Sequence, residues 1–142
     1  FGATEMRACG FTASEMRAGG WEAKKLFQAG YDTTEVRRAD YPLERLRLAG
    51  YEAKALRKAG ATASEMRAAG FELQQLQQAD YSPAELQAAG FDALALKEAG
   101  ATLAQLRQSN APVSALREAG FKADRLKLEG YSAHELIEGG CR

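Results

Sequence analysis

The chain has 142 residues, of which 46% are hydrophobic and 27% charged, and its 19 basic side chains are balanced by 19 acidic ones. Zero net charge excludes a global field that would draw the protein to nucleic acid, anionic lipid or acidic substrates. No stretch approaches the ~18 to 20 consecutive apolar residues of a membrane-spanning helix, so we expect no membrane span.

A period of ten residues organises the chain. Glycine recurs at every tenth residue except three, where Asp40, Asp80 and Asn110 stand instead. These residue types tolerate a left-handed backbone best, so each tenth residue is expected to end a local element. Residues 1–140 are therefore predicted to form one array of fourteen decapeptide repeats, with 141–142 as a tail or the start of another repeat. Phe1 stands in register and no Met or targeting segment precedes it, so we expect a stretch of a longer protein.

Each repeat is predicted to carry one short helix, over residues 3–9, 13–19 and so on to 133–139. Position two of the repeat supplies good N-cap residues, whose side-chain oxygen accepts an unpaired backbone N–H: Thr12, Asp32, Thr62, Ser82, Asp92, Thr102 and Ser132. Glu or Gln three residues later completes a capping box in six of these repeats: Glu15, Glu35, Glu65, Glu85, Gln105 and Glu135. Pro83 falls at the first helical position, where its missing N–H costs nothing. The tenth residue is placed to be the left-handed C′ residue of a Schellman ending.

Two positions of the repeat are predicted to form the core. Position six is always Leu, Met or Val, and position one is aromatic in eleven of the fourteen repeats. The aromatic ring at position one and the aliphatic side chain at position six of the same repeat have the spacing of a hydrophobic staple. The ring at position one of the next repeat is at C″ of the Schellman ending, where it is also expected to contact position six. Helices below about 12 residues are marginal alone, so stacking must supply the stability. Each repeat is expected to touch mainly its neighbours in sequence, so no intramolecular disulfide is expected between Cys9 and Cys141.

An alternative fold divides each ten into two fives, as in a pentapeptide-repeat β-solenoid. Residues 79–93, ADYSPAELQAAGFDA, superficially fit that pattern. The β-solenoid would bury position four, which holds Lys24, Glu44, Lys54, Gln74, Asp124 and His134. Burying unpaired charge is costly, so the all-α solenoid of fourteen one-helix repeats is the favoured prediction.

Repeats such as YSPAELQAAGF, residues 81–91, and FTASEMRAGGW, residues 11–21, resemble a known kind of short array. These decapeptide arrays, of the form aromatic-Ser/Thr-Ala-x-Glu-Leu-Lys/Arg-x-Ala-Gly, occur in long proteins of microbes and algae. The resemblance covers the whole chain and implies a repeat type without an associated activity. Pro42, Pro112, Glu129 and Gly139 depart from the form, which puts the cap geometry at those residues in question.

Position seven carries a series of cations at one-repeat spacing. The candidates for polyanion or partner contact are Arg37, Arg47, Arg57, Arg67, Lys97, Arg107, Arg117 and Lys127. A row of cations at regular spacing could bind the successive phosphates of a nucleic acid. Each cation also lies in the last helical turn, where it favours the negative end of the helix dipole, and acids at positions five and eight neutralise the surroundings. A structural role for the cations is therefore favoured over nucleic-acid binding.

Positions four and eight vary most between repeats and are candidates for a binding face on a constant scaffold, or for an ordinary solvated face. At position seven, Phe27 and Ile137 replace the cation with an apolar side chain and are candidates for an apolar contact, or are ordinary surface hydrophobes.

The sequence contains no catalytic, cofactor-binding or metal-binding motif. His134 is the only histidine and no nucleophile motif accompanies it, and Cys9 and Cys141 lack the spacing of a zinc site. No cofactor and no small-molecule substrate are expected. The favoured function is a non-enzymatic scaffold, spacer or filament component that contacts protein partners or copies of itself. A phosphate- or nucleic-acid-binding array is the alternative.

Overall fold

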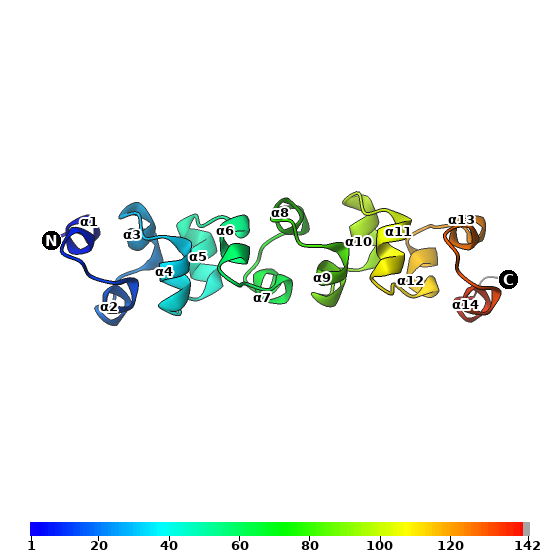
Figure 1. The fold of residues 1–142 in the computed structure, drawn as a ribbon, viewed down its shortest axis with the longest axis horizontal. Helices are drawn as coiled ribbons and strands as arrows, with labels where there is room; N and C mark the ends of the chain where they lie inside the picture. The colour runs from blue at the N-terminus through cyan, green and yellow to red at the C-terminus, as the bar shows by residue number, and fades with distance from the viewer. Residues whose placement is uncertain (141–142) are drawn as a thin grey trace. The chain divides into compact units, whose positions relative to one another are not determined.

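The computed structural model describes residues 1–140, and within that range the chain forms fourteen helices and no strand (Figure 1). The helices are α1 (Ala3–Ala8), α2 (Ala13–Ala18), α3 (Ala23–Gln28), α4 (Thr33–Arg38), α5 (Leu43–Ala49), α6 (Ala53–Lys58), α7 (Ala63–Ala68), α8 (Leu73–Gln78), α9 (Pro83–Ala88), α10 (Ala93–Glu98), α11 (Leu103–Gln108), α12 (Val113–Glu118), α13 (Ala123–Leu128) and α14 (Ala133–Glu138). The all-α repeat prediction is confirmed. No described helix has the length and apolar character needed to cross a bilayer.

The predicted helix starts are confirmed by their caps. All six expected capping boxes form; in the second repeat, the Thr12 hydroxyl accepts from the Glu15 N–H at 3.3 Å and the Glu15 carboxylate accepts from the Thr12 N–H at 2.8 Å. These hydrogen bonds hold the pKa of Glu15 below its ordinary value. Two of the residues that depart from the repeat form, Pro42 and Pro112, occupy N-cap positions without a side-chain cap.

The helices end one residue earlier than predicted, at position eight in every repeat except the fifth, where α5 includes Ala49. Position nine turns out of the helix because the N–H of position ten bonds to the carbonyl three residues back, as Gly10 N does to Arg7 O at 2.9 Å. The next N–H, that of Phe11, bonds to Met6 O at 3.2 Å. These two hydrogen bonds are the predicted Schellman motif.

The three non-glycine joints adopt the same left-handed backbone as the glycines. Asp40, Asp80 and Asn110 have φ of 59°, 67° and 58°, while the glycines at position ten lie between 78° and 102°. The prediction for these exceptions is confirmed, so the left-handed residue at position ten is present in every repeat from the first to the fourteenth.

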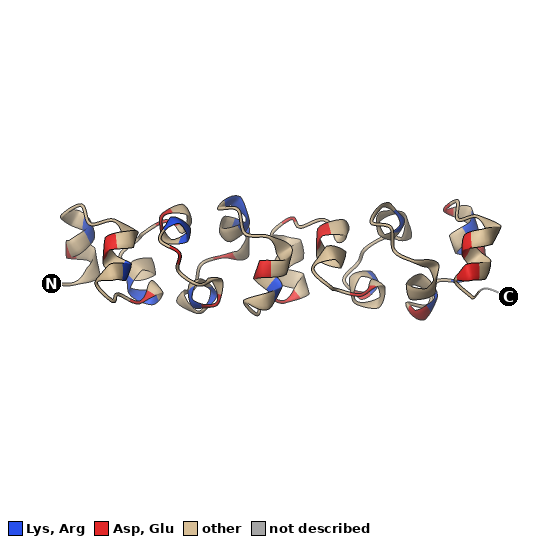
Figure 2. Cartoon of the chain, turned by 90° about the horizontal axis from the view of Figure 1, so that it is seen from below, with Lys and Arg blue, Asp and Glu red and all other residues tan. Residues whose placement is uncertain are grey.

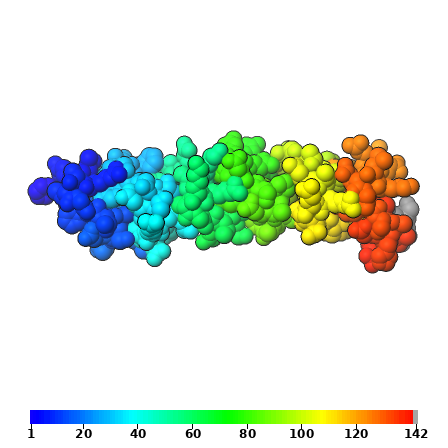
Figure 3. Space-filling model, viewed as in Figure 1, coloured from blue at the N-terminus to red at the C-terminus, as the bar shows by residue number. Residues whose placement is uncertain are grey.

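The chain divides into two compact units, an N-terminal unit Phe1–Asp80 and a C-terminal unit Tyr81–Arg142. In the N-terminal unit successive helices alternate between two sides, so that α1 packs on α3 and α2 on α4 (Figure 1). In the C-terminal unit α9 packs on α11 and α10 on α12. The expectation that a repeat touches mainly its sequence neighbours is corrected here: the tight joint turns the chain back and forth, so a helix finds its main packing partner two repeats on. In the space-filling view the repeats of the N-terminal unit still follow one another in sequence order (Figure 3).

The core of both units consists of positions six and one, together with Ala, Leu or Val at position three and mostly Ala at position nine. The position-six side chains from Met16 to Leu126 are at most 1% exposed, whereas Met6 and Leu136 are half-buried. Burial of position six is therefore confirmed. Position one is buried at Tyr31, Tyr41, Tyr51, Phe71, Tyr81 and Tyr131.

The tyrosines at position one make a second, polar connection between alternate repeats. The hydroxyls of Tyr31, Tyr41 and Tyr51 donate to the carbonyls of Phe11, Trp21 and Tyr31, at 2.6, 2.7 and 3.0 Å. Each bond joins position one of a repeat to position one of the repeat two before it. A buried hydroxyl needs such a partner, which explains why tyrosine is compatible with this core position.

Alkaline pH should destabilise the array through these phenols. Burial raises the pKa of Tyr31, Tyr41 and Tyr131, and raises that of Tyr51 from 10.0 to about 12, with Glu35 adding to the shift at Tyr51. The folded state thus favours the neutral phenol, so its stability is intact below pH 10 and is lost as pH rises toward about 12. Thermal unfolding followed by circular dichroism across this interval measures the loss.

Tyr51→Phe is the matched variant. It should be about 1 kcal/mol less stable near neutral pH, because the hydrogen bond to Tyr31 O is missing. It should also lose less stability between pH 10 and 12 than the parent chain. Parallel pH profiles for the two chains would show that Tyr51 does not carry the effect.

The adjacent glycines Gly19 and Gly20 should respond to alanine with opposite signs. Gly19 has an ordinary φ of −78° and its added Cβ would meet Trp21 Cδ1 at 3.4 Å, so Gly19→Ala should stabilise by about 0.4 to 1 kcal/mol. Gly20 has a φ of 80° and nothing within 4 Å of an added Cβ, so Gly20→Ala should cost about 1 to 2 kcal/mol through the backbone alone. Chemical denaturation of the two variants checks the prediction.

Gly139 provides the control for the position-nine effect. It occupies the same repeat position as Gly19, but its added Cβ would collide with the Val113 side chain. Gly139→Ala should therefore destabilise. A stabilising effect at both 19 and 139 would mean that space at position nine does not matter.

Candidate functional site

Seven of the position-seven cations cap helices two repeats away. Six of them donate to the carbonyl at position nine, 22 residues further on: Arg7 to Ala29 at 3.0 Å, Arg17 to Ala39 at 2.9 Å, Arg47 to Ala69 at 2.8 Å, Arg57 to Ala79 at 3.1 Å, Lys97 to Ala119 at 2.7 Å and Arg117 to Gly139 at 2.8 Å. Arg107 donates in the same way to Glu129 O, and to Gly130 O at 2.8 Å. These carbonyls form the negative end of a helix, where a cation is favoured.

The same cations also cover aromatic rings. Arg7 lies 5.2 Å from the centre of the Tyr31 ring and Arg17 lies 5.8 Å from that of Tyr41. In the C-terminal unit, Lys97 lies 4.7 Å from the centre of the Phe121 ring and Arg107 lies 5.1 Å from that of Tyr131. Each ring belongs to position one, immediately after the helix that the cation caps. Carbonyl and ring together fix the cation in place.

The structure places the eight predicted contact cations individually rather than as one open stripe. Arg47, Arg57, Lys97, Arg107 and Arg117 make the backbone hydrogen bonds described above. Arg37 instead approaches the Glu65 carboxylate at 3.9 Å, and its buried Nε has no hydrogen-bond partner. Arg67 lies in the last turn of α7, and Lys127 is exposed on α13.

The two apolar exceptions at position seven differ from each other. Phe27 packs its ring edge-on against Tyr51, with centroids 4.9 Å apart and an angle of 75° between the ring planes. A Cβ built on Gly50 would lie 3.3 Å from Phe27 Cε1. At Gly70 the equivalent space is occupied by the Arg47 guanidinium, so Phe27 stands where an arginine stands in other repeats. The ring is nevertheless 45% exposed, and Ile137 is 69% exposed on α14.

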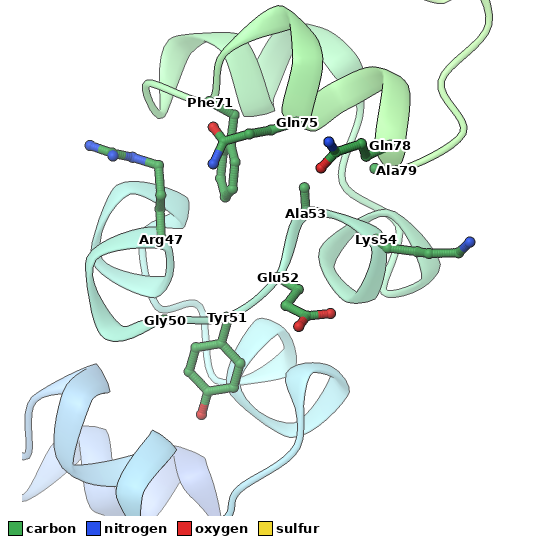
Figure 4. A pocket seen from close by; sticks show the side chains of 10 residues that line it. All are labelled: Arg47, Gly50, Tyr51, Glu52, Ala53, Lys54, Phe71, Gln75, Gln78 and Ala79. Carbon is green, nitrogen blue, oxygen red and sulfur yellow. The ribbon is translucent and has the colours of Figure 1, made fainter.

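Shallow grooves recur between stacked helices at equivalent repeat positions. One groove of about 510 Å³ in the N-terminal unit is lined by Arg47, Gly50–Lys54, Phe71, Gln75, Gln78 and Ala79. Figure 4 shows Phe71, two residues before α8 begins, and Gln75 of α8 on the side of the groove that faces the turn with Gly50 and Tyr51. A groove of about 490 Å³ in the C-terminal unit is lined by the same ten repeat positions, 60 residues later, including Arg107, Tyr131 and Glu135. Each groove contains a position-seven Arg and an aromatic ring, but the polar residues differ: Gln75 and Gln78 in the first groove are replaced by Glu135 and Glu138 in the second.

The variable positions four and eight are exposed in every repeat. Acidic and basic residues are interspersed along each unit instead of forming separate patches (Figure 2). On this surface Lys54 pairs with Asp80 at 2.9 Å and lowers the pKa of that carboxyl. The variable side chains are thus held at regular intervals on a constant backbone.

His134 and Cys9, the residues considered for catalysis or metal binding, lie on the surface of different repeats. His134 is 3.2 Å from Glu138, and both side chains are largely exposed. Cys9 is a free, exposed thiol, while Cys141 lies outside the described residues. Within residues 1–140 no three His, Cys, Asp or Glu side chains gather closely enough to hold a metal ion.

Two contacts that define the array were absent from the sequence predictions. One is the capping of a helix by position seven of the helix two repeats earlier, and the other is the series of tyrosine hydroxyl bonds. The regular Arg or Lys at position seven was the only sequence signal for the first. For the second, the signal was the use of tyrosine where phenylalanine also occurs.

Comparison with known protein families identifies the repeat family of the chain. A family model described as "Decapeptide repeat region" matches residues 20–93 and 81–142, which is more than half of the chain. No curated protein and no solved structure matches the chain. The ten-residue period, the left-handed joint and the single helix per repeat agree with this assignment, and the chain belongs to the decapeptide repeat family.

Proposed function

We propose that the chain is a non-enzymatic structural scaffold, a spacer that holds positions four and eight at regular intervals for contact with other proteins. The strongest support is that four other positions of the repeat have structural roles. Positions one and six fill the core, position seven caps a helix two repeats on, and position ten forms the joint. The exposed positions four and eight can differ between repeats without changing the stacking.

A spacer should keep a fixed distance between two points on its surface. Spin labels at Ser14 and Ser64, both exposed at position four of the N-terminal unit, measure that distance in a chain whose native cysteines are changed to serine. We expect one narrow distance distribution. Inserting a second copy of residues 31–50 after Gly50 should lengthen the mean distance without widening the distribution, and further copies should add equal steps.

A Gly/Ser insert of equal length is the matched control, because a flexible linker widens the distribution. Broad distributions in the parent chain, or unequal steps, would contradict the spacer. Turnover of any substrate that is lost in His134→Ala would contradict the non-enzymatic assignment.

Polyanion binding, the alternative function, has a separate test. Retention on heparin should fall steeply with salt and with neutralisation of Arg107, Arg117 and Lys127 if the cations bind phosphate or sulfate. Because most position-seven donors already bond to backbone carbonyls, we expect little retention. Strong, salt-dependent retention would favour the alternative over the spacer.

A further inference from the structure

The groove between α3 and α5 is a further copy of the two grooves described above. It has a volume of about 360 Å³ and is lined by residues 22–24 and by Tyr41, Arg45, Leu48 and Ala49. Each of these residues has its counterpart 30 residues later in the groove of 510 Å³ and 90 residues later in the groove of 490 Å³. Every one of the three grooves therefore brings position four of one repeat, such as Lys24, together with position eight of the repeat two on.

Polar side chains of the other two grooves have partners within the chain. In the groove of 510 Å³, Lys54 pairs with Asp80 at 2.9 Å, and Gln75 is the capping-box residue of α8. In the groove of 490 Å³, Glu135 is the capping-box residue of α14. These side chains therefore contribute to the stability of their own repeats.

The α3–α5 groove differs, because its charged side chains have no partner. The side chains of Glu22, Lys24 and Arg45 make no hydrogen bond or ion pair with any residue in the range 1–140. All three are exposed, and so is Leu48, which stands where the other grooves have Gln78 and Glu138. An exposed leucine and three unpaired charges thus line a single groove.

The pairing of Arg45 with Leu48 occurs a second time in the sequence. Arginine at position five and leucine at position eight occur together here and as Arg125 with Leu128, and neither residue type occupies its position in any other repeat. Residues three apart on a helix lie on the same face, so the two side chains act as one surface unit. The second occurrence lacks the other cation of the groove, because Ala104 stands at the position equivalent to Lys24.

We propose that the α3–α5 groove binds a short segment of another protein in which an apolar side chain is flanked by carboxylates. The apolar side chain packs against Leu48, and the carboxylates bind Lys24 and Arg45, whose guanidinium can hold a carboxylate through two N–H donors. Glu22 in the same groove repels a uniformly anionic chain, which favours such a segment over a polyanion. This proposal rests on the proposed scaffold function and names the chemistry of its partner.

Nuclear magnetic resonance of the whole chain, titrated with a synthetic peptide, tests the groove. The probe is a short acetylated peptide with a central leucine flanked on both sides by glutamate, and its counterpart carries lysine in place of every glutamate. The glutamate peptide should shift the amide signals of residues 22–24 and 41–49 in a saturable manner, and the lysine peptide should not. No shift up to millimolar peptide, or equal shifts with both peptides, would overturn the proposal.

Leu48→Ala and Arg45→Ala should each weaken binding of the glutamate peptide about tenfold, the order of loss expected when one buried side chain or one charged contact is removed. Both residues are exposed, so neither change should affect folding, which circular dichroism checks. Gln78→Ala, at position eight of the groove of 510 Å³, is the matched control. Leu128→Ala should also bind like the parent chain, because Ala104 replaces the second cation there. Loss of binding in either control would contradict the assignment to the α3–α5 groove.

Reversing the two cations gives the sharpest outcome. The double variant Lys24→Glu with Arg45→Glu should lose binding of the glutamate peptide and gain binding of the lysine peptide. Retained binding of the glutamate peptide would overturn the role of the charges. Shifts of the same amides that grow with the concentration of the parent chain alone would identify a second copy as the occupant and would also overturn the proposal. Absence of peptide binding together with narrow spin-label distances would leave the spacer intact, so the two proposals fail separately.

Discussion

Leu46→Ala should destabilise the N-terminal unit by about 2 to 5 kcal/mol, the usual cost of truncating a fully buried leucine. Leu46 is 0% exposed at position six of α5, in a repeat with stacked partners on both sides, α3 and α7. Chemical denaturation gives the change in the free energy of unfolding. Amide hydrogen exchange should show lost protection in α3, α5 and α7 first, because the stability of an array is a sum of local terms.

The matched control lies two residues further along the same helix. Leu48 is 61% exposed at position eight, so Leu48→Ala should change stability by no more than about 0.5 kcal/mol. The two variants remove the same atoms from the same helix, and only burial differs. Equal effects would mean that position six does not form the core.

Arg47→Ala should have the next largest effect, a loss of about 1.5 kcal/mol, at the lower end of the range for a hydrogen bond from a charged group because Arg47 is half-buried. The Arg47 Nε bonds to Ala69 O at 2.8 Å, so its removal leaves the end of α7 without this cap. Arg45→Ala is the control: Arg45 is exposed on the same helix, and its removal should be close to neutral. Thermal unfolding compares the two.

Arg47→Phe separates the two parts of the role of position seven. Phe27 shows that a ring in this location packs against glycine and the following aromatic side chain. Arg47→Phe should therefore recover part of the stability lost in Arg47→Ala, since Gly70 and Phe71 are available to it. If the phenylalanine variant is as unstable as the alanine variant, packing over the joint contributes nothing and the hydrogen bond carries the whole effect.

The local features of the fold were predictable because each depends on residues within one joint. Thr12 with Glu15 specifies a helix start by hydrogen bonds three residues apart, and Asp40 in the place of a glycine specifies the ending. The error of one residue at the helix ends has the same local origin, since the Schellman turn draws position nine out of the helix. These features follow from local backbone hydrogen bonding and do not depend on how the repeats pack on one another.

The contacts between repeats were not predictable in the same way. Whether Arg7 reaches Ala29, and Tyr31 reaches Phe11, depends on how far each joint turns the chain. That angle results from the packing of rings and anchors together, and no single residue specifies it. The candidate cations were therefore identified correctly as a regular series, while the carbonyls that they bond to were not identified.

The spacing of these contacts bears on how the chain folds. Each interaction that joins alternate repeats spans only about two dozen residues, as from Arg7 to Tyr31, and the same span recurs in both compact units. Contacts of short, constant range make the search for partners independent of chain length, in contrast to folds that pair their ends. A repeat leaving the ribosome could dock as soon as its second successor has emerged, so folding can keep pace with synthesis.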